Sequence, residues 1–277
     1  MKLKDLFTLG NLLCGFLSVV VLFHGYFDWA CYLIYIAYVF DVLDGPVARL
    51  TKQFDKFGSV FDTVSDFITN SIAVSFIIYY AFWKNANYHW ILAAAIAAFP
   101  FCFGTIRQAK SMERELSYPC YWLGIPRPVL AIFVLAMLNS SLCTVNISPW
   151  REIGYAVAAI LVVVLSVLHL SKIPFVNHNE RRWMNALFFG MHVFLTGTPI
   201  AFVLGWVFLD SPAFVYDYVL FCLIIYLFVS WTQIPRVDIQ RIRTYVAGGP
   251  LVKPLVHRDN TWRSKSFADF FSVKNAD

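Results

Sequence analysis

Eight apolar runs, each long enough to cross a lipid bilayer, constrain this 277-residue chain most strongly. A transmembrane helix needs about 20 apolar residues. Hydrophobic residues make up 59% of the sequence and charged residues only 14%, which excludes most water-soluble folds. We predict an all-α integral membrane protein, a polytopic bundle of about eight transmembrane helices. The runs cover residues 8–26, 29–49, 58–83, 88–108, 126–145, 152–171, 185–209 and 213–233.

The distribution of Lys and Arg predicts the orientation in the membrane. If the N-terminus is cytosolic, every Lys and Arg except Lys84 and Arg151 falls on the cytosolic side. Cytosolic loops carry such an excess of positive charge. The net charge of +5 therefore indicates contact with anionic lipid headgroups rather than with nucleic acid. We expect a multi-pass protein of a bacterial or archaeal cytoplasmic membrane, with both termini in the cytosol.

The composition changes after residue 234. Residues 1–234 carry all of the apolar runs, so we expect them to form the membrane-embedded catalytic domain. Residues 235–277 are polar and basic and are predicted to be a cytosolic tail that lies against the membrane. The six cysteines are scattered and form no C-x2-C pair, which favours buried core residues over a disulfide framework or a zinc site.

An acidic motif joins the second and third runs, with the spacing D-x2-D-G-x2-A-R-x8-G-x3-D-x3-D. At about 100° per residue, the members on each helix share one face. Two helices linked by a short cytosolic turn are therefore expected to face each other with two carboxylates apiece. The positions are Asp41, Asp44, Gly45, Ala48, Arg49, Gly58, Asp62 and Asp66.

Carboxylates at the membrane edge need a positive partner, because each costs a few kcal/mol when unpaired. Donor groups with oxygen alone, without His or Cys, favour Mg²⁺ or Mn²⁺, which are usually shared with substrate phosphates. The small residues of the motif let a charged group approach the backbone, and Arg49 offers a forked donor for phosphate oxygens. The motif predicts a metal and diphosphate site that opens to the cytosol. The expected metal ligands are Asp41, Asp44, Asp62 and Asp66.

All eight motif positions resemble the signature of the CDP-alcohol phosphotransferase family. Its members are integral membrane enzymes that move a phosphoalcohol group from a CDP-alcohol to a hydroxyl and release CMP. The resemblance implies that Asp41, Asp44 and Asp62 bind the metal and the CDP diphosphate, while Asp66 is the general base for the acceptor. It also implies a homodimer, and a CDP-lipid pocket lined by Gly45, Ala48, Arg49 and Gly58.

Two further stretches resemble the phosphatidylserine synthases of that family, which implies CDP-diacylglycerol as donor and L-serine as acceptor. One is the run YWLGIPRPVLA, which is similar to a Gly-Leu-Pro-x-Pro stretch of that subgroup. After Asp66 the subgroup commonly reads Val-Ser-Phe-Gly, whereas this chain reads FITNSIAVS. The other stretch is the opening run, with Thr8, Gly10, Asn11, Cys14 and Gly15 in matching places.

The carboxylate of a serine acceptor needs a cation at the cytosolic side. Glycerol 3-phosphate would use the same cations for its phosphate, and inositol would need hydrogen-bonding groups unless it is phosphorylated, so these acceptors stay open. Asn11 is expected either to face the nucleotide or to bond a neighbouring helix. The candidate cations are Arg107, Lys110, Arg114 and Arg127.

A lipid or anion transporter is the alternative from a different class of protein. A transporter typically has charged groups near the middle of the membrane and internal repeats. The acids of this chain lie at the predicted cytosolic edge, and its sequence contains no evident internal duplication. The sequence therefore favours the enzyme.

Overall fold

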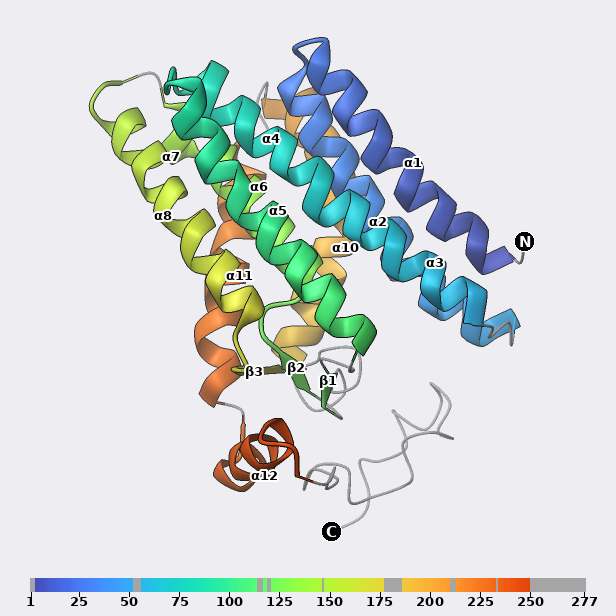
Figure 1. Ribbon diagram of the computed structural model, residues 1–277. Helices are drawn as coiled ribbons and strands as arrows, with labels where there is room; N and C mark the ends of the chain where they lie inside the picture. The colour runs from blue at the N-terminus through green and yellow to red at the C-terminus, as the bar shows by residue number, and fades with distance from the viewer. Residues whose placement is uncertain are drawn as a thin grey trace.

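The structure is a computed structural model that describes residues 3–51, 56–113, 117–118, 121–145, 147–176, 186–209, 213–232 and 234–249. Within these ranges, the side chains of residues 46, 48, 49 and 186–196 lie outside the description, as do several next to the range ends. The fold is mostly helical, as predicted, and its long helices run side by side in one bundle (Figure 1).

The chain starts with a helical hairpin of α1 (Leu3–Phe23) and α2 (Phe27–Thr51). Gly25 has a φ of 88° in the turn between them, a conformation that favours glycine. The next helix is continuous and contains α3 (Lys56–Phe67), the π-helical η1 (Ile68–Ala73), α4 (Val74–Tyr80) and the π-helical η2 (Ala81–Asn85). Then follow α5 (Trp90–Glu113), α6 (Arg127–Leu138), α7 (Ser141–Thr144), α8 (Trp150–Leu170), α10 (Ala186–Leu209) and α11 (Ala213–Thr232).

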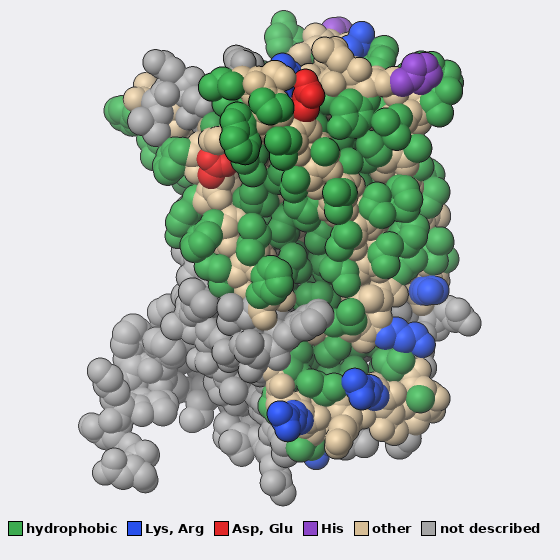
Figure 2. All heavy atoms as spheres, turned by 90° about the vertical axis from the view of Figure 1, so that its left-hand side faces the viewer, with side chains coloured by type: hydrophobic (Ala, Val, Ile, Leu, Met, Phe, Trp, Pro, Cys, Tyr) green, Lys and Arg blue, Asp and Glu red, His purple; other side chains and the backbone are tan. Residues whose placement is uncertain are grey.

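Five described helical stretches are long and apolar enough to cross a membrane. They are Lys4–Phe23, Phe57–Asn85, Trp90–Met112, Arg127–Thr144 and Trp150–Leu170. Three further predicted runs coincide with α2, α10 and α11, which are not among these five stretches. Of these helices, α2 contains three aspartates. The space-filling view shows a broad hydrophobic band with Lys and Arg at both of its ends and more of them at the lower end (Figure 2). The structure thus supports a membrane protein with five candidate spans, and the count of eight stays a prediction.

Helix α6 lies in the core of the bundle. Every side chain from Val129 to Leu138 is buried. The helix packs against α8, α11 and η1, and the Tyr35 hydroxyl of α2 donates to the Ile132 carbonyl at 3.4 Å. A helix that is apolar on all sides is typical of such a central position. Its ends therefore have fixed places relative to the helices around it.

A small antiparallel sheet lies at one end of the bundle, in the order β1-β2-β3. Its strands are β1 (Ser117–Tyr118), β2 (Tyr121–Leu123) and β3 (Pro174–Val176). The sequence did not predict this sheet, because strands of two or three residues are too short to show an alternating pattern. Strand β2 leads into α6 and pairs with the strand that follows α8, so two distant loops form one layer.

The predicted tail begins with a helix, α12 (Arg236–Val246), which lies across the end of the bundle (Figure 1). The helix starts after Pro235 and ends before Gly248, whose φ is 95°. Asp238 is fully buried and accepts a hydrogen bond from the Tyr121 hydroxyl at 2.8 Å. The first part of the tail therefore packs on the sheet. Residues 250–277 lie outside the described residues, and the domain boundary at residue 235 stays a prediction.

The close contact between α7 and α8 predicts the effect of one substitution. A Cβ atom on Gly154 would lie 2.3 Å from the carbonyl oxygen of Leu142. We expect Gly154→Ala to lower the midpoint of thermal unfolding in detergent, because overpacking costs about 1–3 kcal/mol. Gly197→Ala is the control: a Cβ there meets nothing within 4 Å, and Ala is the better helix former. Equal midpoints for the two variants would contradict the packing described.

Candidate active site

The carboxylates of the motif come together between α2 and α3. Asp41, Asp62 and Asp66 each offer one oxygen, and these oxygens all lie within 4.8 Å of one another. Asp44 lies outside this group of three, but its carboxyl is within hydrogen-bonding reach of Asp62, as the carboxyl of Asp41 is of Asp66. The spacing predicted two facing pairs of acids, and the structure places four carboxyl groups together.

Helix α1 supplies polar contacts to two of these acids. The Thr8 hydroxyl donates to Asp44 at 3.3 Å, and Nδ2 of Asn11 donates to Oδ1 of Asp66 at 3.0 Å. Asn11 is buried, and its backbone carbonyl accepts from the Thr69 hydroxyl at 3.3 Å. Its amide therefore bonds a neighbouring helix, one of the two expected roles, and orients Asp66. The nucleotide-facing role of Asn11 stays a prediction.

The charge of the site is strongly unbalanced. Among the described side chains, Lys4 and Arg127 interact electrostatically with Asp62, and Arg127 also interacts with Asp66. Four carboxylates at hydrogen-bonding distances cannot all stay ionised without further positive charge between them, because each lies in a partly buried, weakly polar environment. The site therefore needs bound protons or a bound cation.

The π-helical segment η1 follows Asp66 almost directly and contains the stretch in which this chain departs from the subgroup. Thr69, Asn70 and Ser71 are all buried there. A Cβ on Gly15 of α1 would lie 2.5 Å from the Thr69 hydroxyl, and one on Gly104 of α5 would lie 2.5 Å from that of Ser71. Single π-helical turns often occur at functional sites. Here the segment packs between two glycines, next to the predicted general base.

The predicted cations differ in where they lie. Arg107 is buried, and its Nη1 donates to the carbonyls of Leu123, at 2.9 Å, and His169. Lys110 is exposed, and Arg114 lies outside the described residues. Of the three candidates that the structure describes, only Arg127 interacts electrostatically with both Asp62 and Asp66. It is therefore the cation that lies beside the acids.

Arg127 contacts Gln108, a residue that the sequence analysis did not identify as part of the site. Its Nη1 donates to the Thr63 carbonyl at 3.2 Å and to Oε1 of Gln108 at 2.7 Å. Nε2 of Gln108 is buried and has no hydrogen-bond partner in the described structure. A polar side chain near the cytosolic end of an apolar run was the available signal. Thr8 was also missed as a site residue, although it lies in the stretch that resembles the subgroup.

The small residues of the motif are only partly described. Gly58 is buried, and Gly45, directly after Asp44, is half-buried. Ala48 and Arg49 belong to the last turns of α2, and their side chains lie outside the described residues. The CDP-lipid pocket predicted around these four residues therefore stays a prediction.

The donor set fits a hard divalent cation. It consists of carboxylate oxygens from two helices, which Mg²⁺ and Mn²⁺ prefer over nitrogen or sulfur. In addition, Oδ1 of Asp62 is buried without a hydrogen-bond partner among the described residues, so this oxygen is available to bind a cation. Buried polar atoms rarely stay unpaired.

Carboxylates that converge between apolar helices fit the class of membrane proteins that can bind a divalent cation through oxygen ligands. The chain belongs to the CDP-alcohol phosphatidyltransferase family, whose sequence model matches residues 1–168. This match confirms the family that the motif predicted. It extends far beyond the motif and includes the helices that contribute Asn11, Gln108 and Arg127.

Three relatives show what the chain is similar to. It is 32% identical to a CDP-diacylglycerol–serine O-phosphatidyltransferase of Helicobacter pylori over 69% of this chain and 79% of the relative. It is 24% identical to a protein of the same name from Methanocaldococcus jannaschii, over 71% of this chain and 85% of the relative. It is also 28% identical to an archaetidylserine synthase of Methanothermobacter thermautotrophicus, over 62% of this chain and 69% of the relative.

Metal binding can be tested without turnover. We expect Mn²⁺ to raise the unfolding midpoint of the protein, since a ligand at a hundred times its Kd stabilises by about 2.7 kcal/mol. Asp41→Asn should lose most of this shift, because it removes a charge from the group of three. Asp217→Asn is the control: that acid bonds Ser141 on another part of the bundle, so the Mn²⁺ shift should persist. An undiminished shift in Asp41→Asn would rule out the site.

Proposed function

We propose that the protein is a CDP-diacylglycerol-dependent phosphatidyltransferase that moves a phosphatidyl group to the hydroxyl of L-serine and releases CMP. The observation that carries the proposal is the convergence of Asp41, Asp62 and Asp66 in a chain of the CDP-alcohol phosphatidyltransferase family. The names of the relatives support CDP-diacylglycerol as donor and serine as acceptor.

Each acid has a role in this reaction. Asp41, Asp44 and Asp62 would hold Mg²⁺ or Mn²⁺, and Asp66, which belongs to the group of three with Asp41 and Asp62, would face the same ion. Such an ion, when bound, neutralises the diphosphate and stabilises the charge that develops on the departing CMP. Gly58 and the small residues at the end of α2 would leave room for the diphosphate, and Arg49 would bind its oxygens.

Asp66 would accept the proton of the serine hydroxyl. As the serine Oγ bonds to the phosphorus that carries diacylglycerol, the bond from that phosphorus to the oxygen of CMP breaks. CMP leaves with the electron pair, and the proton passes to the Asp66 carboxylate. The hydrogen bond from Asn11 keeps this carboxylate in one orientation. Because a carboxylate is a weak base for an alcohol, positioning and charge neutralisation supply most of the catalysis.

Arg127 and Gln108 would bind the carboxylate of serine. Arg127 lies at the start of α6 beside the acids, and Gln108 of α5 accepts one of its N–H groups. The amide N–H₂ of Gln108 is buried and has no hydrogen-bond partner among the residues that the structure describes. A guanidinium and an amide next to each other offer two donors to one carboxylate. Lys110 and Arg114 remain candidates from the sequence, while Nη1 of Arg107 donates to backbone carbonyls.

We also propose a topology of eight spans with both termini in the cytosol and a cavity that opens to that side. The pattern of Lys and Arg supports it. Residues 1–234 would form the membrane domain and residues 235–277 the tail. The relatives come from bacteria and archaea, which supports a cytoplasmic membrane of such a cell. A homodimer is an expectation from the family resemblance.

The first test measures CMP release by purified protein in mixed micelles with CDP-diacylglycerol, Mn²⁺ and serine. We expect release that depends on serine, and a loss of at least about 100-fold in Asp66→Asn, because it removes the general base. Binding of CDP-diacylglycerol should persist in that variant; its loss would instead assign Asp66 to holding the metal. Release with glycerol 3-phosphate or inositol but not with serine would overturn the acceptor. Movement of labelled lipid without CMP would favour a transporter.

The second test separates the acceptor site from the donor site. Arg127→Gln should raise the KM for serine about 10-fold or more, because a hydrogen bond to a charged group contributes about 1.5–3 kcal/mol. Gln108→Leu should raise the same KM, with a smaller effect on the KM for CDP-diacylglycerol. Lys84→Gln, an exposed cation in η2 outside the candidate site, is the control. An equal rise of both KM values would show that Arg127 supports the site as a whole rather than serine.

A further inference from the structure

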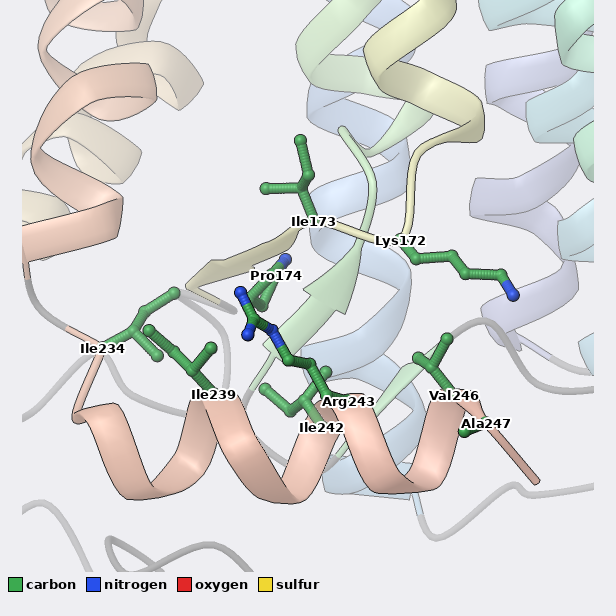
Figure 3. Close-up of a pocket in the computed structure, with 9 residues that line it drawn as sticks. All are labelled: Lys172, Ile173, Pro174, Ile234, Ile239, Ile242, Arg243, Val246 and Ala247. Atoms are coloured by element: carbon green, nitrogen blue, oxygen red, sulfur yellow. The ribbon is translucent and has the colours of Figure 1, made fainter. Parts of the chain in front are cut away.

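A groove separates α12 from the end of α8 and strand β3 (Figure 3). It has a volume of about 660 Å³. One wall is the inner face of α12, and the other is the segment from Lys172 to Pro174 with Ile234 at one end. None of its lining residues belongs to the acidic motif. The lining residues on α12 and directly after it are Ile239, Ile242, Arg243, Val246 and Ala247.

The walls of this groove are held in place by contacts between α12 and the sheet. Asp238 is fully buried, accepts from Tyr121 of β2 at 2.8 Å and lies 3.8 Å from the guanidinium of Arg241. The rings of Tyr245 and Tyr118 meet edge to face, with their centroids 5.4 Å apart. A buried hydrogen-bonded carboxylate is costly to move. The groove is therefore preformed rather than a gap between loosely attached segments.

The chemistry of the groove is that of an anionic amphiphile. Its floor is formed by isoleucine, valine and proline side chains, whereas its two charged lining residues, Lys172 and Arg243, are both cations and both exposed. Arg243 reaches from α12 toward Pro174, whereas the side chain of Lys172, on the opposite wall, extends away from Arg243 (Figure 3). No Asp or Glu lines the groove within the described residues. Apolar surface and two positive charges together match an acyl chain joined to a phosphate.

The place of the groove in the fold agrees with this ligand. It lies where α8 and α11 end, on the side where α12 crosses the bundle, beyond the hydrophobic band of the surface (Figures 1 and 2). Amphipathic helices at such a level lie along the headgroup region of a bilayer. We propose that the groove binds one phospholipid with an anionic headgroup, its phosphate between Arg243 and Lys172 and its chain along Ile239 and Ile242. This inference does not depend on the proposed function.

Lipid binding tests the proposal directly. The full-length protein is placed in nanodiscs of equal parts phosphatidylcholine and phosphatidylglycerol, and the phospholipid that stays bound after detergent extraction is counted by native mass spectrometry. We expect one retained phosphatidylglycerol. The double variant Lys172→Gln, Arg243→Gln should retain it about 25-fold less, since each cation near the surface contributes about five-fold. The control is Arg236→Gln, an exposed cation at the start of α12 outside the groove, which should retain phosphatidylglycerol.

Other outcomes would overturn the proposal. Equal retention in the wild type and in the double variant would show that phosphatidylglycerol binds elsewhere. Displacement by millimolar glycerol phosphate would show a simple anion site that does not use the apolar floor. A dimer mass that disappears in the double variant, without bound lipid, would assign the groove to contact between two copies of the chain. Because the readout is bound lipid rather than CMP, a failure here is separate from a failure of the proposed activity.

Discussion

Repulsion among carboxylates held between membrane helices is the constraint on which the rest of the structure depends. Asp41 lies within hydrogen-bonding reach of Asp66, and Asp44 of Asp62, in a partly buried setting where like charges interact strongly. Packing elsewhere in the bundle must hold α2 and α3 together against this repulsion. The same proximity makes the site useful, because it concentrates negative charge where a cation and a diphosphate can balance it.

Helix α1 and the π-helical segment η1 hold the carboxylates in this arrangement. In a regular helix, three consecutive residues point in directions about 100° apart and cannot all face one neighbour. Thr69, Asn70 and Ser71 are nevertheless all buried, because helices pack on several sides of η1 and because Gly15 and Gly104 let α1 and α5 approach closely. Asn11 then reaches Asp66 from α1. The orientation of the predicted general base is thus set by residues of a different helix.

Local sequence patterns predicted only part of the candidate site. Helical spacing predicted that the motif acids face one another, and the group of Asp41, Asp62 and Asp66 agrees with that expectation. The spacing did not separate Arg107 from Arg127, because both are basic residues near the ends of apolar runs. In the structure Nη1 of Arg107 donates to carbonyls of strand β2 and of the last turn of α8, whereas Arg127 lies beside the acids. Hydrogen bonds across such distances leave no periodic trace in a sequence.

By itself, the sequence determined the class of fold, the places of the helices and the acids of the site. Apolar length and helical periodicity are local properties, and the acidic motif lies on two consecutive helices. Both can therefore be read along the chain. Tertiary structure alone decided the pairing of Gln108 with Arg127, the small sheet, the docking of α12 through Asp238 and the groove beside it. Each of these joins segments far apart in sequence, and their contacts depend on how the helices pack.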